Sequence, residues 1–168
     1  MRKILFLAII FILTITISLA QPRAVGVRVG WGIGASYQHD FGVKNMLQVD
    51  LDFFSFEAGL QATATYNWIF PFNSWKRAGS WNWYAGVGGG IGMLMPGWWE
   101  HIDPTKLKGA FTGLAGVAGM IGVEYNFKFP LQLSLDYRPL FSPLLFKGGA
   151  GFNMFGVFGG GFAVRYKF

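Results

Sequence analysis

The chain has 168 residues and no cysteine, and 13% of its residues are charged, 18% are aromatic and 25 are glycine. A soluble domain has about 25% charged residues, and a small exported domain without cysteine cannot be held by disulfides. The formal net charge is +6, and apart from the adjacent pairs Arg2-Lys3 and Lys76-Arg77 the cations are dispersed singly, which argues against nucleic-acid binding. At this length we expect one domain.

Residues 1–20 have the organisation of a secretory signal peptide. Arg2 and Lys3 precede an apolar run, residues 4–17, that ends in the small-residue pattern around Ala20. The run is shorter than the roughly 20 residues that a membrane-spanning helix needs, although an uncleaved anchor helix is the alternative. We predict a cleaved signal peptide over 1–20 and a mature domain over 21–168.

The mature sequence alternates between apolar residues and small or polar residues, a period that predicts β-strands. Seven such segments are separated by turn-rich stretches: 24–38, 47–53, 60–68, 81–93, 115–127, 131–138 and one within 150–168. No apolar run after the first is long enough for a transmembrane helix. The membrane-compatible architecture is therefore a closed β-barrel, in which every backbone polar group is paired.

The same alternation fits a soluble sandwich or barrel with its apolar face inward. However, the second face is mostly small and uncharged, whereas about a quarter to a third of a water-facing surface is charged. Small polar residues suit the inside of a narrow barrel. Aromatic residues also gather at segment ends, which is typical of outer-membrane barrels. These residues are Tyr37, Phe53, Tyr66, Trp68, Trp81, Trp83, Tyr125, Phe127, Tyr137, Tyr166 and Phe168.

We predict an all-β, antiparallel, up-and-down transmembrane β-barrel of eight strands, because single-chain bacterial barrels have even strand numbers. The eighth strand comes from splitting the first segment near Gly30–Gly34, where glycine would permit a positive φ. The short turn at 126–130 and Phe168 would lie on the periplasmic side. The stretches 95–109 and 139–149 would lie outside.

Seven charged residues occupy the middle of strands on the face opposite the apolar one. They are Arg28, Asp50, Asp52, Glu124, Asp136, Arg138 and Arg165. Because buried charges must be paired or hydrated, we predict an inward salt-bridge network that plugs the lumen. A gated narrow pore, in which the pairs exchange partners, is the alternative.

No motif for catalysis, a cofactor or a metal stands out, and we predict no catalytic, cofactor-binding or metal-binding residue. The glycine-rich stretch 86–92 lacks the following helix of a dinucleotide-binding loop. A lipid-modifying enzyme is the alternative, in which His39 or His101 would pair with Ser36 or Asp40 for nucleophilic catalysis. In the loop 95–109, exposed tryptophans would anchor at the membrane interface or contact a partner.

The last strand has Phe162, Val164, Tyr166 and Phe168 on one face, which we expect to contact lipid. Arg165 lies on the other face and would point into the lumen, towards the acids of neighbouring strands.

Several stretches resemble a family of small eight-stranded outer-membrane β-barrel proteins with OmpA/OmpX-like architecture. These stretches are GASYQHDFGVKNMLQVDLDF, WNWYAGVGGGIG, IGVEYNF, PLQLSLDYRP and FAVRYKF. The resemblance covers nearly the whole mature chain and implies location in a Gram-negative outer membrane. It implies that Phe162, Val164, Tyr166 and the terminal Phe168 form the insertion signal that the assembly machinery recognises. Some barrels of this size act on lipid A, but the His-x-Ser-Asn pattern of one of them is absent here.

The expected function is thus that of an integral outer-membrane protein of structural or surface-interaction type. We expect a monomer that contacts outer-membrane lipid and lipopolysaccharide, meets the assembly machinery during insertion, and needs no cofactor.

Overall fold

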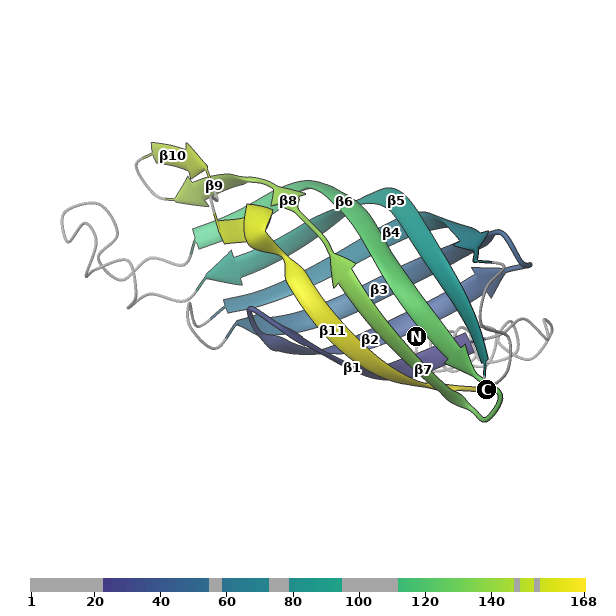
Figure 1. Cartoon of the computed structure of the whole chain (residues 1–168). Helices are drawn as coiled ribbons and strands as arrows, with labels where there is room; N and C mark the ends of the chain where they lie inside the picture. The colour runs from purple at the N-terminus through teal and green to yellow at the C-terminus, as the bar shows by residue number, and fades with distance from the viewer. Residues whose placement is uncertain (1–22, 55–58, 73–78, 95–111, 147–148, 153–154) are drawn as a thin grey trace, which may run out of the picture.

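The computed structural model describes residues 23–54, 59–72, 79–94, 112–146, 149–152 and 155–168. The expected signal peptide and the loop 95–109 lie outside these residues. The described chain forms a closed antiparallel barrel of eight strands, as predicted (Figure 1). No helix within it is long and apolar enough to cross a membrane.

The barrel strands follow one another in chain order, and the last pairs with the first. They are β1 (Arg23–Gly30), β2 (Ile33–Phe41), β3 (Asn45–Phe54), β4 (Gly59–Pro71), β5 (Gly79–Leu94), β6 (Thr112–Phe127), β7 (Leu131–Tyr137) and β11 (Gly160–Lys167). The short strands β8 (Leu140–Phe141) and β9 (Pro143–Phe146) continue the line of β7 along β6. Beyond them, β10 (Gly149–Phe152) pairs with β9, and a 3-10 turn, η2 (Phe155–Phe158), leads into β11.

The predicted split of the first segment is confirmed, since β1 ends at Gly30 and β2 begins at Ile33. The expectation that a glycine with a positive φ within Gly30–Gly34 makes this turn is wrong. Gly42, in the next turn, is the glycine with a positive φ (72°) among the described residues. The β1–β2 turn instead closes through the Gly30 amide, which donates to the carbonyl of Gly32 at 2.8 Å.

The strand register sets the tilt and width of the barrel. We start at Val123 on β6 and move from each residue to its paired residue on the next strand, through β7, β11, β1 and on to β5. This path returns to β6 at Gly113, ten residues from its start. With about 3.3 Å per residue along a strand and about 4.8 Å between strands, this stagger tilts the strands by about 40°. Eight strands leave an interior just wide enough for side chains.

The two ends of the barrel differ. Arg23 and Phe168 exchange backbone hydrogen bonds of 3.1 and 2.8 Å, so the first and last strands meet at one end. The turns at 42–44 and 128–130 lie at the same end. We call this end, formed by Arg23, 42–44, 128–130 and 167–168, the C-terminal rim. The opposite end, with the β1–β2 turn, β9, β10 and η2, is the distal end (Figure 1).

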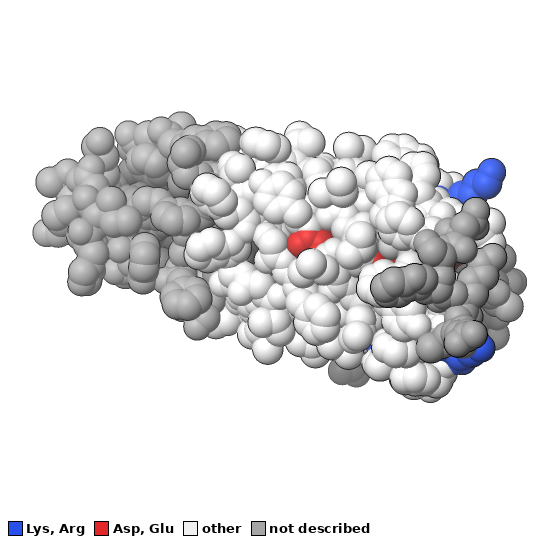
Figure 2. Space-filling model, viewed as in Figure 1, with Lys and Arg blue, Asp and Glu red and all other residues white. Residues whose placement is uncertain are grey.

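The polarity of the two strand faces is the reverse of that in a soluble barrel. Outward residues in the middle of the wall are large and apolar, and Val87, Ile121 and Leu135 are 57%, 52% and 60% exposed. Inward residues are mostly polar and buried, as with Thr63 at 2% and Asn67 at 0%. The visible face of the described wall is accordingly almost free of charge (Figure 2).

Aromatic side chains form a belt around the wall above the C-terminal rim. Phe70 and Trp83 stack with ring centroids 4.2 Å apart. Other contacts join Tyr37, His39, Phe41, Tyr66 and Trp68 in one run, and Trp81, Tyr125, Phe127 and Phe129 in another. Exposed aromatics also occur towards the distal end: Trp31, Phe53, Phe141 and Phe158.

Candidate functional site in the charged interior

Arg28 connects two acids in the middle of the barrel. Its Nε and Nη2 donate to Oδ1 of Asp136 on β7, two strands away along the wall, at 3.0 and 2.6 Å. Its Nη1 lies 3.9 Å from Oδ1 of Asp52 on β3. All three residues are at most 4% exposed. A guanidinium suits this position because its fork of donors can reach several acceptors at once.

Arg138, just after β7, links the two acids of β3. Its Nη1 donates to Oδ2 of Asp50 at 2.5 Å, and its Nη2 donates to Oδ2 of Asp52. Asp52 therefore lies between Arg28 and Arg138, and the two arginines share it. Both members of each pair are almost wholly buried, so each charge depends on its partner.

Arg165 lies inside the barrel, 0% exposed, but forms no ion pair with a described acid. Its Nε donates to Oγ of Ser36 at 2.9 Å and its Nη1 to Oγ of Ser134 at 2.7 Å. Ser36 in turn donates to Asp50, so a hydroxyl connects Arg165 to the carboxylates. Its Nη2 has no hydrogen-bond partner among the described residues.

Glu124 is separated from the other six predicted charges. Its Oε1 accepts hydrogen bonds from the side-chain amides of Asn82 and Asn126, both at 2.8 Å. Its Oε2 accepts one from Gln132 at 2.8 Å. Three amides thus satisfy this carboxylate, and no described lysine or arginine forms an ion pair with it.

Several neutral residues of the site were missed at the level of sequence. Tyr84, 0% exposed, donates to Oδ2 of Asp136 at 3.4 Å. Gln48 donates to Oδ2 of Asp50 at 2.8 Å and accepts from Gln38 at 2.9 Å. Their positions on the inward face were visible in the alternation, but their partners were not.

Two inward glycines make room for the largest interior groups. A Cβ at Gly161 would lie 2.5 Å from the guanidinium of Arg28. A Cβ at Gly122 would lie 2.6 Å from the ring and hydroxyl of Tyr84. Such distances are far below van der Waals contact, so both side chains depend on the absence of a neighbouring one.

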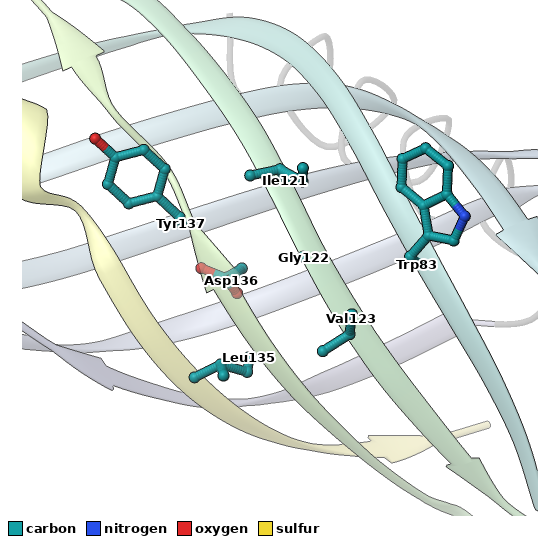
Figure 3. Close-up of a pocket in the computed structure, with 7 residues that line it drawn as sticks. All are labelled: Trp83, Ile121, Gly122, Val123, Leu135, Asp136 and Tyr137. Carbon is teal, nitrogen blue, oxygen red and sulfur yellow. The ribbon is translucent and has the colours of Figure 1, made fainter.

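A groove of about 400 Å³ lies on the outer wall over the same region (Figure 3). Its lining residues are Trp83 of β5, Ile121, Gly122 and Val123 of β6, and Leu135, Asp136 and Tyr137 of β7. The side chain of Asp136 is 0% exposed, because it points inward to Arg28. The groove therefore presents apolar side chains outward.

The lumen is filled at successive levels. Leu94, Leu114, Ala118 and Leu140 pack together towards the distal end. The ion cluster follows, next to a cavity of about 30 Å³ lined in part by Arg28, Asp52 and Arg138, which has room for one or two water molecules. Below the ion cluster, Met46, Tyr84 and Met120 form a second packed layer.

A vestibule of about 730 Å³ opens at the C-terminal end, beyond that layer. Asp40, Asn82, Glu124 and Lys167 are among its lining residues. It does not continue into the ion cluster, because Met46 and Tyr84 are both 0% exposed.

The residues considered for nucleophilic catalysis do not assemble. Ser36 is buried on the inward face of β2, whereas His39, three residues later, lies on the outward face and makes an edge-to-face contact with Phe41, with ring centroids 4.9 Å apart. An odd separation in a strand places side chains on opposite faces. His39 therefore cannot act as the base of Ser36, and His101 lies outside the described residues. No described group of acids or histidines could hold a metal ion.

The residues of β11 that were predicted to face lipid, and Phe168 directly after it, all lie on the outside. Phe162, Val164, Tyr166 and Phe168 are exposed, while Ala163 and Arg165 between them are wholly buried. No protein-family model, curated protein or solved structure matched the chain. Its function must therefore be inferred from the barrel's own surface and interior.

Proposed function

We propose that the chain is an integral outer-membrane β-barrel protein of structural or surface-interaction type whose lumen is closed by the inward charges. The observation that carries this proposal is the inversion of polarity across the wall. Large apolar side chains face outward all around the barrel, while aspartates, arginines and amides face inward. Membrane barrels in lipid have this arrangement.

The outward face is too apolar for water. Monomeric soluble proteins rarely expose contiguous apolar patches of more than a few hundred Å², and larger patches mark interaction or membrane surfaces. All five described acidic residues lie on inward positions of the strands. Lipid is the solvent in which such an outer surface is stable.

The lengths of the strands fit a bilayer. A tilted membrane strand needs about 9–11 residues, and β2 to β6 have between 9 and 16. β1, β7 and β11 are shorter, with 8, 7 and 8 residues, and β8 and β9 continue the line of β7. Closure of β11 onto β1 leaves no unpaired edge around the wall. The aromatic belt above the C-terminal rim and the aromatics towards the distal end lie where the two interfaces would be.

The interior supports a plug rather than a pore. Arg28 and Arg138 bridge β1 and β7 to the acids of β3, and the Met46–Tyr84–Met120 layer blocks the lumen next to them. Opening would require several buried charges to lose their partners together, which is costly in a low dielectric. We assign no reaction and no cofactor to this interior.

We further propose that the protein is a monomer in contact with outer-membrane lipid and lipopolysaccharide, delivered by the assembly machinery. Closure supports this, because the eight-stranded wall presents no edge for pairing with a second copy, and the edge strand β10 has only four residues.

Reconstitution tests the proposal. The purified chain, folded into vesicles that contain a small self-quenched dye, is expected to float with the vesicles after a urea wash and to release no dye. A planar bilayer should likewise show no conductance steps. Dye release at a rate proportional to the amount of inserted protein would contradict the closed lumen, and failure to float would contradict membrane insertion.

A further inference from the structure

We infer that the C-terminal rim binds the phosphate groups of anionic phospholipids in the membrane leaflet that it borders. The inference rests on the proposed membrane location and adds the lipid class and the end of the barrel that selects it.

The cations outside the lumen gather at one end. Of the seven described lysines and arginines, Arg28, Arg138 and Arg165 lie in the interior. The other four lie at the C-terminal rim: Arg23, Lys44, Lys128 and Lys167. The described residues of the distal end include no charged side chain. Figure 2 shows the basic colour at the end that carries the C terminus.

No described acid lies on the outer side of the rim beside Arg23, Lys44 and Lys128, whereas Lys167 is on the inward face of its strand and shares the vestibule with Asp40 and Glu124. Asp40 is the acid nearest the rim, and it lies on the inward face and lines the vestibule. Glu124 is 3% exposed and is held by three amides. The outer side of the described rim therefore carries the positive charges of Arg23, Lys44 and Lys128 without a described acid beside them.

The lysines of the rim have hydrogen-bond donors that no described protein group uses. Lys44 and Lys128 are exposed in their turns, and neither forms an ion pair or a side-chain hydrogen bond with another described residue. Lys167 uses one donor, to Oδ1 of Asn126 at 2.9 Å, and an ammonium group has three.

The strand order places these cations side by side. The β6–β7 turn, β11, β1 and the β2–β3 turn follow one another around the barrel, so Lys128, Lys167, Arg23 and Lys44 lie along a continuous arc. The aromatic belt begins directly above it: the rings of Phe127 and Phe129, on either side of Lys128, are 4.8 Å apart. Aromatic rings locate the interface, and cations beside them reach the headgroup phosphates.

Quenching of tryptophan fluorescence by brominated lipids measures this preference in the full chain. The protein is folded into phosphatidylcholine vesicles that contain equal fractions of either brominated phosphatidylcholine or brominated phosphatidylglycerol. We expect stronger quenching by the anionic lipid. The double variant Lys44→Gln/Lys128→Gln should lower the relative association constant by roughly 5-fold for each lysine removed. The matched control Lys44→Arg/Lys128→Arg keeps the charge and should keep the preference.

Equal quenching by the two lipids in the wild type would overturn the inference while leaving membrane insertion intact. A preference that survives unchanged in the double glutamine variant would also overturn it, because the preference would then not arise at this rim. Failure of the protein to insert into pure phosphatidylcholine would overturn the proposed function, and this inference with it.

Discussion

Arginine in place of Val87 is expected to reduce the stability of the barrel in lipid by about 2–4 kcal/mol, or to prevent its insertion. Val87 lies in the middle of the 16-residue strand β5, on the outward face, and is 57% exposed. In a bilayer this position meets the hydrocarbon core, where a cation loses its hydration. In a soluble barrel the same change would add a charge to a wet surface and would shift stability by no more than about 0.5 kcal/mol.

Val43→Arg is the matched control for Val87→Arg. Val43 is even more exposed, at 84%, but it lies in the β2–β3 turn at the C-terminal rim. There the arginine would reach water and headgroups, so we expect little change. Urea unfolding of each variant folded into vesicles compares them directly. Equal behaviour of the two variants would show that the wall does not face lipid.

Replacement of Arg138 by methionine is expected to cost about 3–5 kcal/mol, because it leaves two buried carboxylates without their main cation. Asp50 and Asp52 are 1% and 2% exposed and cannot recover their hydration without opening the barrel. The free energy of unfolding in vesicles measures the loss. Lys128→Met, which removes an exposed turn cation, should change it by no more than about 0.5 kcal/mol in phosphatidylcholine vesicles, which contain no anionic lipid.

A second variant distinguishes a loss of stability caused by unpaired charges from one caused by poorer packing. The triple variant Arg138→Met/Asp50→Asn/Asp52→Asn removes all three charges together. It should recover much of the stability lost in Arg138→Met, since the methionine stem remains and no carboxylate is left unpaired. If the single and triple variants were equally unstable, the ion pairs would not be what holds this part of the lumen.

Much of the fold was predictable from alternation alone. A strand period of two sorts residues onto two faces, so Arg28, Asp50 and Asp136 could be placed inward without knowledge of their partners. A two-residue turn preserves that parity, which is why the first segment read as one continuous pattern across Gly30 and Ile33. The extension of β7 into β8 and β9 was harder to predict, because Pro139 and Pro143 interrupt the pattern.

The partners within the site were not predictable, because they depend on the stagger of the whole barrel. The ten-residue offset sets which inward positions share a level. It brings Arg28 of β1 to Asp136 of β7, two strands away, and separates Glu124 from the ion cluster. The same offset puts the hydroxyl of Ser36, rather than a carboxylate, within reach of Arg165. The number of residues between two positions in the sequence does not indicate whether their side chains are in contact here.

Extraction of the full-length chain from isolated cell membranes tests the central claim most directly. After washes in high salt and then in urea or carbonate, the protein should remain in the membrane pellet and be released only by detergent. Release into the soluble fraction by salt or carbonate alone would contradict an integral membrane barrel and would favour a soluble β-domain at the membrane surface.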